Sequence, residues 1–213
     1  VPNLKGVAIA LDIDLWHGFD DFHKIIVTES KGYAYDQNHD FWVNGLPSSF
    51  IQWLDYTYPV SDDIYMPFMQ NKGYNYNGDV STIPEGAVAL SIDSLWSNFP
   101  SDIITKNLDF FESFLKKAAE RNIYVVGVIA PQVPGYKNTG SYGCYGPKRS
   151  VAMDVIQKVK ELEEKYPGFH LLDEYKMNDN DYSYKMFYDF DHLNNIGATQ
   201  LTSRLDSLLK TLP

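Results

Sequence analysis

The chain has 213 residues, of which 44% are hydrophobic and 22% are charged, with a formal net charge of −10 and a pI of about 4.8. This length and composition suit one α/β domain with a substantial hydrophobic core. The acidic balance excludes a nucleic-acid partner, which needs a basic face, and without a long apolar run we expect no membrane contact by this domain.

Cys144 is the single cysteine. It has no partner for an internal disulfide, and because it stands in a glycine-rich turn we interpret it as an ordinary loop residue. The sequence starts at Val1 with neither an initiator methionine nor a signal peptide, so we expect the chain to be part of a longer protein.

The first expected element is a strand within residues 4–16, whose run VAIAL is rich in small and β-branched residues. Such a run is typical of a strand buried on both faces of a parallel sheet. Ligands of open α/β sheets bind beyond the carboxyl ends of the strands. We therefore expect Asp12, Asp14 and Trp16, which follow this run, to contact a substrate.

Residues 18–85 differ from the rest of the chain, because they are dense in Tyr, Trp, Asn, Asp, Gly and Pro and show weak periodicity. We interpret them as a long, ordered, aromatic-rich insertion within the domain. Residues 87–96 then echo the first apolar run and predict a second buried strand.

The remaining sequence alternates between helical and strand patterns. Apolar residues at helical spacing predict amphipathic helices over residues 106–121, 150–166 and 194–212, and Asn122 is a plausible stop for the first of them. Apolar runs predict strands over residues 123–130 and 169–175. The alternation predicts an α/β fold with a mainly parallel sheet flanked by helices, in a single domain spanning residues 1–213.

The densest group of chemically active residues lies just before the last helix, in the string YDFDHLNNIGA. His192 can act as a general base near neutral pH, provided that a partner fixes its tautomer. Asp189 lies three residues earlier and can fold back onto the ring, whereas the adjacent Asp191 is the second choice. Asn194 can cap the final helix and is also a candidate for substrate contact.

This string, followed by Leu-Asn-x-x-Gly-Ala and an amphipathic C-terminal helix, resembles the SGNH (GDSL-like) hydrolase superfamily, especially its bacterial branch that edits sugar O-acyl groups. The resemblance runs from about residue 87 to the end of the chain. It implies a flavodoxin-like three-layer α/β fold and assigns Asp189 and His192 to a Ser-His-Asp triad. The Tyr- and Trp-rich middle is more loosely similar to a paralogous group of large bacterial predicted lipoproteins of unknown function.

The sequence departs from the family at the nucleophile. It has no Gly-Asp-Ser motif. It also lacks the Gly-x-Asn-Asp block that helps to form the oxyanion hole in this family, and Asp12 and Asp14 would take the place of that block. Either the nucleophile strand lies upstream of Val1, which we favour, or the domain has kept the fold and lost the triad. Ser91 and Ser94 are weaker candidates, since serines after a strand are usually turn formers.

Other arrangements are less favoured. Asp12 and Asp14 could form a paired-carboxylate site, but alternating strand residues point to opposite faces. Three histidines lie near aspartates in the sequence, but their spacing matches no known metal-ligand pattern. Four tryptophans could stack on sugars, although tryptophans more often pack in hydrophobic cores. These residues are His17, His23, His39, Trp16, Trp42, Trp53 and Trp96.

The resemblance implies an esterase or acyltransferase that acts on an O-acylated carbohydrate, either a small molecule or a polysaccharide, without a metal or organic cofactor. It also suggests an exported protein in the periplasm or at the cell surface. The alternative is a non-catalytic carbohydrate-binding or scaffold module that has lost the triad.

Overall fold

The computed structural model describes residues 4–13, 16, 81, 83–89, 101–144 and 147–212. All of them belong to one compact unit, which comprises Val1–His17 and Tyr76–Pro213. Asp14 and nearly all of the aromatic-rich segment 18–85 lie outside the described residues. Among the described helices, none is both long and apolar enough to cross a membrane.

A parallel sheet forms the centre of the described unit. Its three strands are β1 (Gly6–Ala10), β2 (Tyr124–Ile129) and β3 (Phe169–Asp173), in the order β1-β2-β3. Gly6 pairs with Tyr124 in the first ladder, and Val125 pairs with Phe169 in the second. Because all three strands run in the same direction, their carboxyl ends meet at one edge of the sheet.

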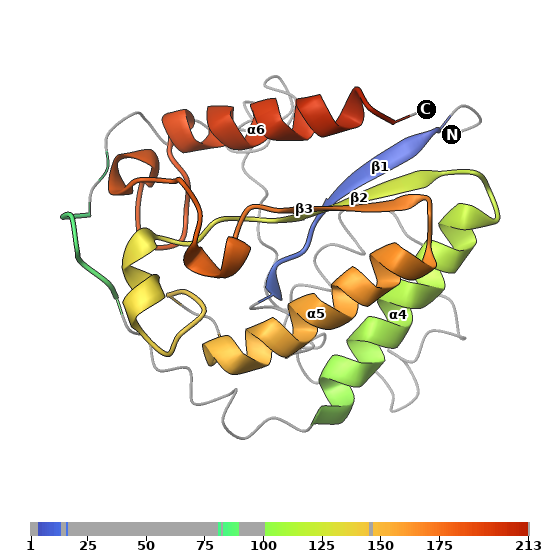
Figure 1. Ribbon diagram of the computed structural model, residues 1–213, viewed down its shortest axis with the longest axis horizontal. Helices are drawn as coiled ribbons and strands as arrows, with labels where there is room; N and C mark the ends of the chain where they lie inside the picture. The colour runs from blue at the N-terminus through green and yellow to red at the C-terminus, as the bar shows by residue number, and fades with distance from the viewer. Residues whose placement is uncertain are drawn as a thin grey trace, which may run out of the picture. The chain divides into compact units, whose positions relative to one another are not determined.

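Three α-helices accompany the sheet: α4 (Ser101–Ala119), α5 (Arg149–Lys165) and α6 (Asn195–Leu209). In Figure 1, α4 and α5 lie on one side of the strands and α6 lies on the other. The described chain is therefore an α/β fold with a parallel sheet between helices, as the sequence predicted.

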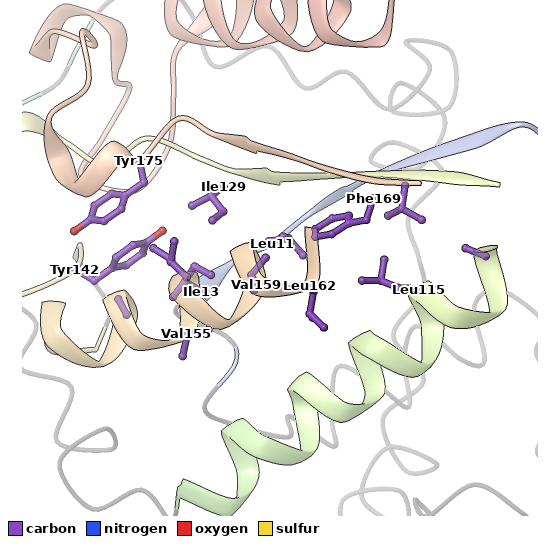
Figure 2. Close-up of a cluster of buried hydrophobic side chains, with 14 residues drawn as sticks. Leu11, Ile13, Leu115, Ile129, Tyr142, Val155, Val159, Leu162, Phe169 and Tyr175 are labelled. Carbon is purple, nitrogen blue, oxygen red and sulfur yellow. The ribbon is translucent and has the colours of Figure 1, made fainter. Parts of the chain in front are cut away.

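The main hydrophobic cluster fills the space between the sheet and the pair α4 and α5. Figure 2 shows Leu11 and Phe169 from the sheet facing Leu115 of α4 and Val159 of α5. Successive side chains along β1 and the residue after it point to opposite faces of the sheet. Val7, Ile9 and Leu11 therefore pack on the cluster, while Ala8 and Ala10 between them are exposed. The buried members are Leu11, Ile13, Leu115, Ala118, Val125, Ile129, Tyr142, Ala152, Val155, Ile156, Val159, Leu162, Phe169 and Tyr175.

A second cluster lies among the loops that follow the strands. It joins the segment at Ile83, the short helix η3 (Pro134–Asn138) after β2, and the chain after β3, and Leu201 of α6 packs against it. Its buried members are Ile83, Val133, Tyr136, Cys144, Tyr182 and Phe187. Cys144, which we expected to be an ordinary loop residue, is thus a buried member of this cluster.

The three predicted helices and three of the four predicted strands are confirmed, with shifted ends. Helix α4 begins at Ser101, five residues before the predicted start, because Ile104 extends its apolar stripe toward the main cluster. The strand predicted over residues 87–96 is not present in its described part: residues 87–89 form no strand, and Ala89 O instead accepts a hydrogen bond from the Tyr136 hydroxyl at 2.8 Å. Residues 90–96 lie outside the described residues.

Asn122 ends α4 as the sequence predicted. Its φ of 53° is left-handed, the Asn122 N–H donates to Ala119 O at 3.0 Å, and the Ile123 N–H donates to Ala118 O at 2.9 Å. This pair of bonds is the Schellman arrangement, in which a left-handed residue lets the chain turn back and satisfy the last helix carbonyls. The turn delivers the chain directly into β2.

We predict that Asn122→Ala lowers the free energy of unfolding by about 1 kcal/mol, because a Cβ-bearing residue without a polar side chain tolerates this φ poorly. Asn122→Gly should be neutral or slightly stabilising, since glycine adopts this φ without a steric penalty. Urea unfolding measures both variants, with Glu120→Ala in the same exposed turn as the control. Equal stability of the Ala and Gly variants would contradict the assignment.

Candidate functional site

The string that contains His192 folds into a tight loop between the short helix η5 (Tyr184–Met186) and α6. Phe187 and Leu193 form an antiparallel bridge at its base. The bridge is bounded by two backbone hydrogen bonds, from Tyr188 N–H to His192 O at 2.8 Å and from Asn194 N–H to Met186 O at 3.0 Å. Since Phe187 is buried in the second cluster and Leu193 packs against it, the core holds the base of the loop in place.

One carboxylate organises the interior of this loop. Asp189 Oδ1 accepts hydrogen bonds from Asp191 N–H at 2.9 Å and from His192 N–H at 2.8 Å. The His192 ring nitrogen Nδ1 lies 2.9 Å from Oδ1 and 3.0 Å from Oδ2 of the same carboxylate. The contact between Asp189 and His192 that the sequence predicted is therefore present, at hydrogen-bond distance.

The contact defines the state of the imidazole. A carboxylate beside Nδ1 favours the tautomer in which Nδ1 carries the proton, which makes Nε2 the nitrogen with the free lone pair. The His192 side chain is 60% exposed, so the ring is open to solvent.

The environment keeps the Asp189 carboxyl ionised. Partial burial by itself raises the pKa of Asp189, but hydrogen bonds from Asp191 N–H, from the His192 ring and from His192 N–H outweigh burial and hold the pKa below its usual range. An ionised carboxylate against Nδ1 is the condition for stabilising a protonated imidazole during proton transfer.

Asn194 fixes the end of the loop. Its Oδ1 accepts from Ile196 N–H at 3.0 Å and Gly197 N–H at 3.2 Å, which caps α6, while its Nδ2 donates to Lys185 O at 2.7 Å. Only 1% of Asn194 is exposed. These contacts show the capping role that the sequence predicted and supply no support for its predicted contact with substrate.

Gly197 allows α6 to approach the loop closely. A Cβ at this position would lie 2.3 Å from Met186 O and 2.7 Å from Leu193 Cδ2. Met186 O is the carbonyl that accepts from Asn194 N–H. The Asn-x-x-Gly spacing therefore has a structural reason: the asparagine caps the helix and the glycine clears the space for the carbonyl beneath it.

No hydrogen bond joins the Asp191 side chain to the His192 ring, whose Nδ1 contacts Asp189 instead. Burial raises the pKa of the half-buried Asp191, the His192 charge lowers it, and the Asp189 and Asp12 charges raise it further. Since such charge effects act over short distances, Asp12 at the end of β1 is an electrostatic neighbour of the loop. Asp12 is exposed, although nearby protein atoms displace part of its water and raise its own pKa.

The loop after β2 also reaches this region. Burial raises the pKa of Tyr136, as do Cys144 and, more weakly, Asp191. Asp12, the loop after β2 and the loop of His192 are therefore electrostatic neighbours. Sequence patterns did not identify Tyr136, because its link to Asp191 joins distant parts of the chain.

Trp16 packs in the main cluster. Its ring meets Phe111 edge to face, with centroids 5.8 Å apart, and its carbonyl oxygen accepts from Asn107 Nδ2 at 2.8 Å. These contacts give Trp16 a role in anchoring α4 and do not support its predicted contact with substrate. Asp14, the other predicted substrate residue, lies outside the described residues.

An ion pair with a buried carboxylate fastens α6 to the chain after β3, and no sequence pattern predicts it. Glu174, which follows β3, is 3% exposed and accepts from Arg204 Nη1, while Arg204 Nη2 donates to Asp181 at 2.5 Å. The guanidinium also lies 5.4 Å from the centre of the Tyr182 ring. A buried carboxylate without such a partner would be strongly destabilising. Glu174 and Arg204 are 30 residues apart, a separation that no local pattern detects.

No metal-binding group emerges from the described residues: they contain no group of three or more His, Cys, Asp or Glu side chains that could hold an ion. Within the same residues, no serine hydroxyl is hydrogen-bonded to His192. Ser91, Ser94 and the histidines at positions 17, 23 and 39 lie outside them.

No protein-family model matches this chain, and no curated protein or solved structure is significantly similar to it. The geometry described above therefore carries the functional argument.

We predict that Gly197→Ala destabilises the protein by about 1–3 kcal/mol, because the added methyl group meets a backbone oxygen. An ordinary glycine-to-alanine change inside a helix would stabilise the helix by about 1 kcal/mol. A destabilising effect of Gly197→Ala would therefore show that α6 approaches the loop closely. Gly140→Ala is the matched control, since a Cβ there meets nothing within 4 Å. Urea unfolding that shows Gly197→Ala to be stabilising would contradict the tight packing of α6 on the loop.

Proposed function

We propose that this chain carries the acid–base half of an SGNH-type esterase or acyltransferase that acts on O-acylated carbohydrate. The observation that supports the proposal most is the contact of Asp189 with Nδ1 of an exposed His192, in a loop that the core and α6 hold firmly. A Ser-His-Asp triad needs this arrangement, whatever the order of its members along the chain.

In this mechanism His192 Nε2 removes the proton from a serine hydroxyl, and the serine oxygen attacks the acyl carbonyl carbon. The bond between that carbon and the sugar oxygen breaks, and the sugar oxygen takes the proton back from Nε2. Water or an acceptor hydroxyl then releases the acyl group by the same steps. Asp189 stays ionised throughout and stabilises the charged ring.

The serine is the part of the mechanism that the described residues do not supply. We propose that it comes from a strand upstream of Val1, with Ser91 and Ser94 as alternatives. The finer features of the fold, the SGNH-like topology and flavodoxin-like three layers, belong to the same proposal. So does an exported location at the periplasm or cell surface.

A second candidate is a non-catalytic carbohydrate-binding or scaffold module with an SGNH-like fold. It is favoured by one observation, that no described serine is bonded to His192. The two candidates differ in a simple way: the module binds glycan but releases no acyl group in any longer form of the protein.

Substitution of the pair separates these candidates. In the chain extended to its natural N-terminus, we expect His192→Ala to abolish release of acetate from O-acetylated sugars and from p-nitrophenyl acetate. Asp189→Asn should lower kcat by about 10³–10⁴-fold, because the ring loses the group that fixes its tautomer. Asp191→Asn is the matched control and should retain most of the activity, since it leaves the Nδ1 contact intact.

Circular dichroism and urea unfolding confirm that each variant is folded before its rate is compared. Hydrolysis that survives His192→Ala would overturn the assignment of the base. If the extended wild-type protein hydrolyses none of these esters and yet binds glycans, the non-catalytic module is the better account.

A further inference from the structure

Two buried side-chain amides in the described part of the chain lack a hydrogen-bond partner. The polar or charged side chains that are buried there are Gln132, Glu174, Asn178 and Asn194. Glu174 pairs with Arg204, and Asn194 caps α6. Among the described residues, no hydrogen bond joins the side chain of Gln132 or of Asn178 to another group. A buried amide without a partner destabilises the folded state, so each of these two amides needs a physical reason.

The two amides differ in their access to solvent. Both amide atoms of Asn178 are sealed inside the protein, whereas the amide of Gln132 is not among the sealed polar atoms of the described residues. Gln132 is 8% exposed, so its side chain is more than nine-tenths buried while the amide still reaches the surface. A ligand can therefore contact the Gln132 amide without unfolding the loop around it.

Gln132 lies at the carboxyl end of the central strand. Strand β2 ends three residues before Gln132, and the neighbouring Val133 is fully buried in the second cluster, which also anchors the His192 loop. A Cβ on Gly135 in η3 would lie 2.3 Å from the Tyr184 hydroxyl, at the start of η5. The loop that carries Gln132 therefore packs on the segment that leads to His192, at the edge of the sheet where open α/β folds bind ligands.

Gly143 makes room for the Gln132 amide. A Cβ at position 143 would lie 2.2 Å from Gln132 Oε1 and 2.7 Å from its Cδ. The amide thus lies against the backbone of a neighbouring loop, which limits its movement on that side. An amide that packing holds in place, without a hydrogen bond to the protein, keeps its donors and its acceptor for a ligand.

The chemistry of the amide restricts the kind of ligand. A glutamine side chain carries no charge and offers two N–H donors and one carbonyl acceptor. Hydroxyl groups both donate and accept hydrogen bonds, so a ligand with several hydroxyl groups matches it. The ionised Asp189 carboxylate and the net charge of −10 disfavour an anionic ligand in this region.

We infer that Gln132 is a specificity-determining residue whose side-chain amide hydrogen-bonds a hydroxyl group of an uncharged sugar unit, the acyl group of which faces His192. This inference rests on the proposed function and adds the residue that recognises the carbohydrate. It also gives the unpartnered amide a reason, because a bound sugar supplies the hydrogen bonds that the protein does not.

Binding and stability together test the inference. In the full chain carrying His192→Ala, partially acetylated xylo-oligosaccharides and manno-oligosaccharides are titrated and binding is followed by calorimetry. Gln132→Met keeps the length of the side chain and removes the amide. We expect it to weaken binding about 3- to 10-fold, the range for loss of one uncharged hydrogen bond, while the midpoint of urea unfolding stays the same or rises. Gln200→Met, the same change in α6, is the matched control and should leave binding unchanged.

Gly143→Ala provides an independent variant. The added methyl group displaces the Gln132 amide, the mobile end of a side chain, and should weaken binding to a similar degree. Gly140→Ala in the same loop is the matched control, since a Cβ there meets nothing within 4 Å, and it should bind as the parent does.

Three results would overturn the inference: no binding of any oligomer by the parent, unchanged affinity in Gln132→Met, or a loss of affinity accompanied by a lower unfolding midpoint, which indicates a structural role. Failure of the proposed function looks different. In that case the oligomers still bind and Gln132→Met still weakens binding, but the chain with His192 intact releases no acyl group.

Discussion

The Asp189 carboxylate is the interaction on which the site depends, because it serves the backbone and the imidazole at once. Its Oδ1 accepts two backbone N–H groups from the turn, and both oxygens lie within hydrogen-bond distance of His192 Nδ1. The same donors that shape the turn also lower the pKa of the carboxyl group. Local folding and the electrostatics of the base are therefore coupled in this loop, because the same carboxylate accepts from the turn and contacts the ring.

The turn is supported by closely packed structure. Phe187 anchors its base in the second hydrophobic cluster, and Asn194 and Gly197 bring the first turn of α6 against the carbonyl of Met186. The buried pair of Glu174 and Arg204 fixes the same helix to the chain after β3. A catalytic or binding group gains accuracy from such a supporting shell, and here the shell includes the second hydrophobic cluster and the ion pair of α6.

The sequence predicted the features that depend on residues close together in the chain. The run VAIAL and the stripe through Leu108, Phe111 and Leu115 predicted β1 and α4, and the three-residue spacing predicted the contact of Asp189 with His192. It could not tell a partly buried irregular segment from a strand at residues 87–89, since both are apolar runs. Nor could it find the electrostatic effect of Asp12 on Asp191 or the ion pair of Glu174 with Arg204, because these interactions join residues far apart in the chain.

The most direct test of this account is the tautomer of His192, read from ring ¹⁵N chemical shifts of the histidine-labelled chain, with the signals of five histidines assigned by His192→Ala. At a pH where the ring is neutral, the account predicts a protonated Nδ1 and an unprotonated Nε2, and a shift toward the Nε2–H form in Asp189→Asn. A wild-type ring protonated at Nε2, or one indifferent to Asp189→Asn, would contradict the claim that Asp189 prepares His192 to act as a base.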